Sequence, residues 1–167
     1  SMRKKYLMTP GPTPVPAEVL LAQARPMIHH RTPDFSATVR ECVEGLKYVF
    51  ETTESDALMF SASGTGAMES SIVNCFSAGD TVIVCQNGKF GQRMVSIAKA
   101  YGLNVVELAY GWQTLIDPAD VAAALEANPE ARGVVVVQSD TSSGILNDVA
   151  AIGEIVAKYD ECVFIVD

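Results

Sequence analysis

Four short polar segments contain the residues that could do chemistry in this sequence. The first, Ser63-Gly64-Thr65-Gly66, stands between an apolar run and an expected helix. At such a junction, free backbone N–H groups and the positive end of the helix dipole favour an anion, and glycine lets the anion approach the backbone. The simpler alternative is that Ser63 caps the helix and Gly64 forms the turn, and the motif alone favours it.

The second segment, "QNGKFGQR", places Phe90 at the next strand-to-helix junction. On an adjacent strand, this position would bring the ring of Phe90 near the same anion site, where a flat cofactor could stack on it. An aromatic residue that packs over the start of its helix is the simpler alternative, and the segment alone favours it.

The third and fourth segments also follow apolar strands. "VQSDTSSGILND" contains one acid, Asp140, and hydroxyls of which Thr141 or Ser142 could donate to a phenolate-like oxygen. A polar loop that turns at Gly144 explains the segment equally well. Asp167 ends "CVFIVD", where an apolar setting would raise the pKa of its carboxylate unless a cation lies near. The alternative is that Asp167 caps the next element.

Helices and strands are expected to alternate along the chain and so to bring these segments together. The apolar periodicity and the turn residues predict helices that begin near Pro16 and over 34–52, 64–76, 90–102, 117–128 and 148–159, and strands over 57–61, 80–86, 104–110, 132–139 and 162–167. Runs such as "GVVVVQ" are apolar on both strand faces, which favours an α/β fold with a mostly parallel sheet covered by helices on both sides. In such sheets the ligand lies beyond the carboxyl ends of the strands.

The composition favours a small-molecule ligand. The chain has 167 residues, 49% hydrophobic and 19% charged, and its net charge of -8 argues against a nucleic acid or an anionic membrane as the main partner. The four cysteines form no C-x-x-C pair, which indicates a reducing, cytoplasmic compartment. His29-His30-Arg31 has no acid or cysteine at ligand spacing, so we expect no metal site.

Taken in order, "MTPGPTPVP", "HHRTPDF", "SASGTGAME", "NGKFGQR", "SDTSSGILND" and "FIVD" resemble the first half of a class V pyridoxal-phosphate aminotransferase. The likeness is strongest to alanine:glyoxylate and serine:pyruvate (or serine:glyoxylate) aminotransferases, including bacterial proteins labelled a soluble hydrogenase small (tritium exchange) subunit. It covers essentially the whole chain. The resemblance implies the fold type I large domain, incomplete at its C-terminus, with an extended arm over 1–15, the N-terminal part of the cofactor-binding large domain over 16–167, and no C-terminal small domain.

The resemblance also implies a cofactor, pyridoxal 5'-phosphate, and roles for the residues that match the family's motifs. The cofactor phosphate would be held by Ser63, Gly64 and Thr65. Phe90 would stack on the pyridine ring, Thr141 would bond the 3-hydroxyl oxygen, and Asp167 would pair with the ring nitrogen. Gly11 would lie near the substrate. Asp140 stands where many relatives have Glu.

The implied reaction moves an amino group from a small amino acid, alanine or serine, to a 2-oxo acid, glyoxylate or pyruvate, in a ping-pong cycle of a homodimer. The family's Schiff-base lysine comes some two dozen residues after the aspartate and is not among these 167 residues, so we expect the chain alone to be inactive. The alternatives are a class V cysteine desulfurase-like lyase, which usually stacks a histidine on the ring, and a non-catalytic subunit.

Overall fold

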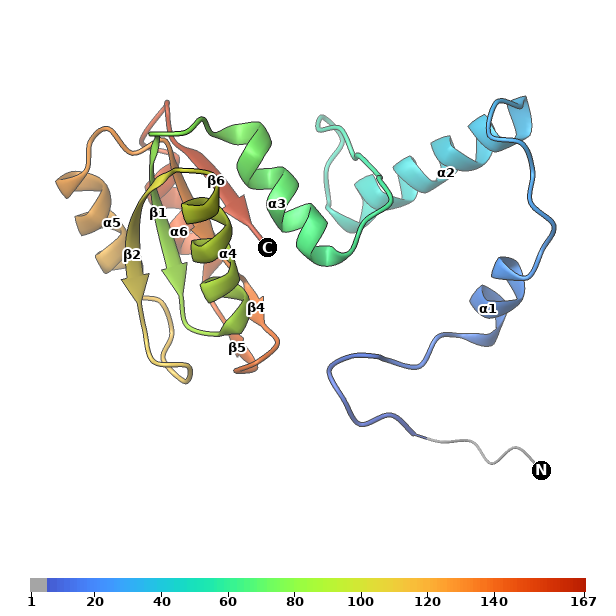
Figure 1. The fold of residues 1–167 in the computed structure, drawn as a ribbon, viewed down its shortest axis with the longest axis horizontal. Coiled ribbons are helices and arrows are strands. Elements are labelled where there is room, and N and C mark those ends of the chain that lie inside the picture. Colours follow the sequence, from blue (N-terminus) through green and yellow to red (C-terminus); the bar gives the residue numbers. More distant parts are fainter. Residues whose placement is uncertain (1–5) are drawn as a thin grey trace. The chain divides into compact units, whose positions relative to one another are not determined.

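The computed structural model describes residues 6–167, which divide into two units, Ser1–Ser61 and Ala62–Asp167. In the first unit, α1 (Ala17–Gln23) and α2 (Pro33–Val49) confirm the two expected helices, and neither contains a buried residue (Figure 1). Thr32 caps α2: its side chain accepts a hydrogen bond from the Phe35 N–H at 3.4 Å, and Pro33 occupies the first turn. The sequence therefore fixes the start of α2 locally.

The prediction of a strand over 57–61 is wrong. These residues adopt no regular structure, and Leu58 and Phe60 are 85% and 57% exposed. A strand needs a hydrogen-bonded neighbour, and no part of the described chain pairs with this segment. An apolar run by itself does not supply that neighbour.

The second unit is built on a parallel four-stranded sheet. Its strands lie in the order β2 (Asn104–Ala109), β1 (Thr81–Gln86), β3 (Gly133–Val136) and β6 (Val163–Val166), and every pair is parallel. The expected fold class is confirmed. Because β1, β3 and β6 are adjacent, the segments that follow them leave the same edge of the sheet.

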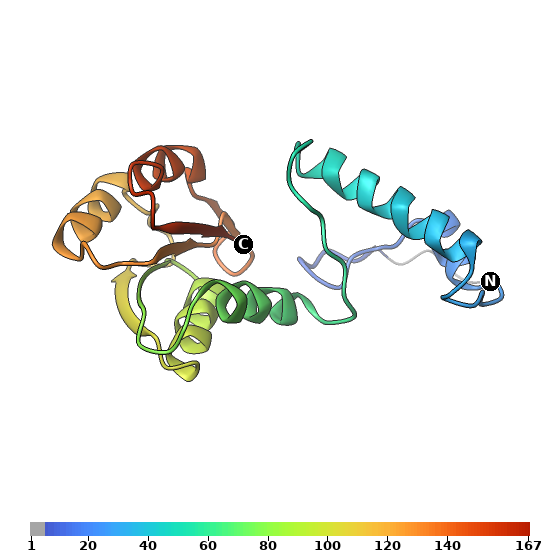
Figure 2. The same ribbon diagram turned by 90° about the horizontal axis from the view of Figure 1, so that it is seen from above.

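Helices cover both faces of this sheet, as the view from above shows (Figure 2). One face carries α3 (Gly64–Cys75) and α4 (Lys89–Ala100), and the other carries α5 (Pro118–Ala127) and α6 (Val149–Val156). All four helices were predicted, with ends that differ by a few residues. Three layers bury both faces of each central strand.

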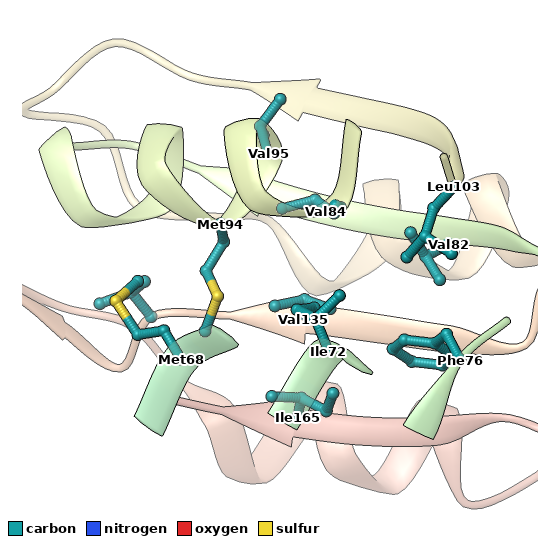
Figure 3. Close-up of a cluster of buried hydrophobic side chains, with 12 residues drawn as sticks. Met68, Ile72, Phe76, Val82, Val84, Met94, Val95, Leu103, Val135 and Ile165 are labelled. Atoms are coloured by element: carbon teal, nitrogen blue, oxygen red, sulfur yellow. The ribbon is translucent and has the colours of Figure 1, made fainter. Parts of the chain in front are cut away.

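Successive residues of a strand enter different cores. Val82 and Val84 pack with α3 and α4, whereas Ile83 and Cys85 pack with α5 and α6. Figure 3 shows the first of these cores, to which α3 contributes Met68 and Ile72, and its C-cap residue Phe76 also packs there. Burial on both faces explains why β1 and β3 read as continuous apolar runs instead of alternating patterns.

A short antiparallel hairpin follows β3. It pairs β4 (Ser139–Asp140) with β5 (Ile145–Leu146), and its turn contains Gly144 at φ +73°. A polar loop with a turn at Gly144 was one of the two explanations that the sequence left open for this segment. The turn at Gly144 is confirmed, but the two-residue strands around it were not foreseen because they are too short to produce an alternating pattern.

No helix over residues 6–167 combines the length and the apolar character that crossing a membrane would need.

Candidate functional site

Residues from three adjacent strands meet at the carboxyl edge of the sheet. Phe90 lies in the first turn of α4 after β1, Asp140 and Thr141 lie in the hairpin after β3, and Asp167 directly follows β6. The site therefore belongs entirely to the second unit. Gly11 lies in the first unit, in an exposed turn where the Thr9 hydroxyl donates to the Pro12 carbonyl at 2.9 Å.

The N-terminus of α3 presents unpaired donors. Ser63 occupies the N-cap position with an extended backbone, but its side chain makes no capping hydrogen bond. Its carbonyl accepts from the N–H groups of Gly66 and Ala67 at 2.8 and 3.3 Å, whereas the N–H groups of Gly64 and Thr65 donate to no residue in the described chain. A Cβ at Gly64 would have no neighbour within 4 Å, so the described chain does not crowd this glycine. The geometry suits an anion.

Arg93 joins this helix end to Phe90. Its Nη1 donates to the Thr65 hydroxyl oxygen at 2.9 Å, and its guanidinium carbon lies 4.9 Å from the centroid of the Phe90 ring. Sequence reasoning missed Arg93. The available signal was its position three residues after Phe90, because residues at that spacing share one face of a helix.

Asp140 holds the start of α4 from across the sheet edge. This carboxylate is fully buried, and its Oδ2 accepts from the N–H groups of Phe90 and Gly91 at 2.9 and 3.1 Å. Its Oδ1 accepts from the hydroxyl and the N–H of Ser142 at 2.6 and 3.1 Å. Burial raises the pKa of Asp140, but the bonds from Ser142, Gly91 and Phe90 outweigh burial and hold the pKa below its usual value.

Asp167 is held by its backbone and leaves its carboxylate without a hydrogen bond in the described chain. Its N–H donates to the Val136 carbonyl at 3.0 Å, and its carbonyl accepts from the Gln138 N–H at 2.8 Å. The residue is solvent-exposed, yet desolvation by nearby protein atoms raises the pKa of its carboxyl, and the charge of Asp140 raises it further. Attraction to Arg93 acts in the opposite direction. A cation beside Asp167 would lower the pKa of its carboxyl and stabilise the ionised form.

The hydroxyls of the hairpin differ in their roles. Thr141 is exposed, and its side chain has no hydrogen-bond partner in the described chain, so it can contact a ligand. Ser142 is committed to the protein: its Oγ donates to Asp140 and accepts from the Lys89 N–H at 2.8 Å. The structure therefore favours Thr141 of the two hydroxyls that the sequence left open.

A pair of buried side-chain amides joins the loops at this edge of the sheet. Asn87 and Asn147 exchange two side-chain hydrogen bonds of 2.9 and 3.2 Å. Asn147 also donates to the Val137 carbonyl at 2.8 Å and accepts from the Ile116 N–H at 3.2 Å. The amides thus tie together the segments that follow β1, β2 and β3. Sequence reasoning missed this pair too.

The match to a known family identifies the chain. Residues 5–167 fit the family described as aminotransferase class-V. The chain belongs to the class-V aminotransferases. Its expected family and fold are confirmed.

Some relatives of this class-V chain are named as aminotransferases, and others are named as hydrogenase subunits. The soluble hydrogenase 42 kDa subunit of Anabaena cylindrica is 44% identical over 98% of the chain, which spans 43% of that relative. The serine–glyoxylate aminotransferase of Methylorubrum extorquens is 34% identical over 89% of the chain and 38% of its own length. The crystal structure of alanine–glyoxylate aminotransferase from Nostoc sp. superposes with a TM-score of 0.93 at 29% identity, over 100% of this chain and 44% of that one. The chain therefore spans less than half the length of the relatives it matches.

Proposed function

We propose that this chain forms the cofactor-binding part of a pyridoxal-phosphate-dependent aminotransferase. The reaction moves an amino group from alanine or serine to a 2-oxo acid, glyoxylate or pyruvate, by a ping-pong mechanism. One observation carries the proposal: one unit contains a helix N-terminus with unpaired donors, a half-buried aromatic ring, a hydroxyl and a carboxylate, and the last two make no side-chain hydrogen bond within residues 6–167. The ring, the hydroxyl and the carboxylate lie at one sheet edge. The enzymes named among the relatives are consistent with it.

The residues present fit the cofactor group by group. Ser63, Gly64 and Thr65 would bind the phosphate, because two N–H donors of α3 are unpaired there. Phe90 would stack on the pyridine ring, and the Thr141 hydroxyl would donate to the 3-hydroxyl oxygen.

Asp167 would hold the proton on the ring nitrogen. When bound, the cofactor supplies an electron sink for the substrate's alpha carbon, and a protonated ring nitrogen makes that sink effective. An anionic carboxylate about 4 Å from a cation attracts it by about 4 kcal/mol at an effective dielectric constant near 20. Because desolvation raises the pKa of Asp167 in the chain by itself, the pyridinium cation would stabilise the ionised carboxylate as well.

The remaining chemistry needs groups beyond these residues. We propose that the 167-residue chain alone does not transfer amino groups, since the family resemblance implies a lysine that these residues do not include. We also propose a homodimer, in which Gly11 would lie near the substrate.

Binding of pyridoxamine 5'-phosphate tests the proposal directly. This ligand carries the ring and the phosphate but has no aldehyde, so it cannot attach covalently to surface lysines, and its fluorescence reports binding. We expect saturable binding by the chain, weakened about tenfold by Phe90→Leu through loss of ring stacking. A wild-type chain that does not bind pyridoxamine 5'-phosphate would contradict the proposed cofactor.

A second experiment tests the expected inactivity. The chain is mixed with pyridoxal 5'-phosphate, reduced with borohydride and mapped by mass spectrometry. A stoichiometric adduct at one lysine, accompanied by amino transfer from alanine or serine, would contradict the inactivity of the chain. Sulfide release from cysteine would favour a desulfurase instead.

A further inference from the structure

Arg93 is the residue that links the separately predicted parts of the site. It contacts Thr65 of the α3 N-terminus and the ring of Phe90, and its charge acts on Asp167. We propose that Arg93 is a positioning residue for a phosphate group, acting through the hydroxyl of Thr65. The inference deepens the proposed function and rests on it for the identity of the cofactor.

In the Arg93–Thr65 hydrogen bond, the hydroxyl of Thr65 acts as the acceptor. A guanidinium can only donate, so the oxygen of Thr65 must accept in the 2.9 Å bond. The hydroxyl proton of Thr65 is then free to point elsewhere, and it donates to no residue in the described chain. Because Thr65 belongs to the first turn of α3, this proton lies at the helix end whose N–H groups are unpaired. Arg93 thus holds the Thr65 hydroxyl through its oxygen and leaves the proton available as an additional donor for an anion.

Stacking on Phe90 fixes the guanidinium in place. The guanidinium lies over the ring at 4.9 Å, a distance at which the cation is attracted to the aromatic face. Both residues belong to α4, so Arg93 is positioned by the same helix that positions the ring. One positive charge at this point also offsets the negative charge of an entering phosphate in a chain of net charge -8.

A double-mutant cycle on the 167-residue chain tests this link. Pyridoxamine 5'-phosphate affinity is measured for Arg93→Gln, Thr65→Val and the double variant. We expect each single substitution to weaken binding about tenfold, and the double variant to be no weaker than about tenfold, because both changes remove the same interaction. Affinity for unphosphorylated pyridoxamine should change less than about twofold in Arg93→Gln, since the effect acts on the phosphate.

Two further variants distinguish a specific role of the Arg93 guanidinium from the effect of losing any positive charge on α4. Lys99→Gln removes the same charge from the same helix at an exposed ion pair with Glu107, and it should leave the affinity within about twofold. Arg93→Lys keeps a charged donor but loses the planar stack, so it should recover part of the affinity. Effects that multiply to about a hundredfold in the double variant would overturn the inference, as would an equal loss of affinity for pyridoxamine.

Inorganic phosphate distinguishes failure of this inference from failure of the proposed function. Its binding is followed through the amide signals of Gly64 and Thr65 by nuclear magnetic resonance. If the wild-type chain binds phosphate there in an Arg93-dependent way but does not bind pyridoxamine 5'-phosphate, the proposed cofactor is wrong and the role of Arg93 stands. If Gly64 and Thr65 do not respond to phosphate, the role of Arg93 is wrong.

Discussion

The carboxylate of Asp140 occupies the space that a side chain at Gly88 would need. A Cβ on Gly88 would lie 2.5 Å from both carboxylate oxygens, far inside van der Waals contact. Gly88 is the N-cap of α4, and Asp140 accepts hydrogen bonds from the first turn of that helix. The glycine therefore allows a buried charge from the hairpin to reach the helix end that carries Phe90.

Gly88→Ala should consequently destabilise the chain. The added methyl group must displace a carboxylate that four hydrogen bonds hold, and we expect the free energy of unfolding to fall by about 2–3 kcal/mol. Urea denaturation measures it. Gly64→Ala is the control for stability, because a Cβ there meets nothing within 4 Å. Equal free energies of unfolding for Gly88→Ala and the wild type would contradict the claim that the Asp140 carboxylate requires a glycine at position 88.

Asp140→Asn should destabilise the chain in a pH-dependent way. An amide cannot satisfy the Phe90, Gly91 and Ser142 donors as a carboxylate does, and we expect a loss of about 1–3 kcal/mol at pH 7. The folded state lowers the pKa of Asp140, so its contribution to stability is present above the unfolded pKa of about 3.9 and disappears as the pH falls through the folded pKa.

The difference between wild type and Asp140→Asn should therefore shrink below about pH 4. Asp148→Asn is a matched control: Asp148 caps α6 by accepting from the Ala151 N–H at 3.0 Å, but it is exposed, and asparagine caps equally well. A constant difference between wild type and Asp140→Asn from pH 7 to acid would contradict the ionised state of Asp140.

Asp167→Asn should change stability and binding in opposite directions. The folded state raises the pKa of Asp167, so its charge costs stability above the unfolded pKa of about 3.9 and costs nothing in acid. We expect the variant to gain less than about 1 kcal/mol at pH 7, because solvent screens this exposed group.

Pyridoxamine 5'-phosphate binding by Asp167→Asn should weaken at the same time, by about tenfold or more, since a neutral amide cannot pair with the protonated ring nitrogen. Thermal unfolding and fluorescence titration measure the two effects on one preparation. Unchanged affinity would exclude Asp167 as the partner of the ring nitrogen.

Asn147→Leu should destabilise the loops that the buried Asn87–Asn147 pair joins. The substitution leaves the Asn87 amide oxygen, the Val137 carbonyl and the Ile116 N–H without their hydrogen-bond partners in a buried place, at a cost of about 2–4 kcal/mol. The Asn87 Nδ2 keeps its bond to the Thr114 carbonyl. Hydrogen exchange should quicken at Ile116. Asn74→Leu, which removes only an exposed bond to the Ser70 carbonyl, should cost less than about 1 kcal/mol. Similar losses at Asn147 and Asn74 would contradict the structural role of the buried pair.

The order of the four helices and of the four strands of the parallel sheet in the second unit could be predicted from the sequence, because apolar periodicity and turn residues act over a few neighbouring positions. The sequence placed Phe90, Thr141 and Asp167 at strand ends for the same reason. The strand predicted over 57–61 was wrong, because a strand depends on a hydrogen-bonded neighbour that the local sequence does not contain.

Which side chains contact one another depends on the fold and could not be predicted from the sequence. Arg93 reaches Thr65 across 28 positions of the sequence, and Asp140 reaches the Phe90 N–H across 50. The parallel order of β1, β3 and β6 brings such distant segments to one sheet edge, and no local pattern encodes that proximity. The residues proposed to contact the cofactor could thus be named from the sequence, whereas the residues that hold them in place could be found only in the fold.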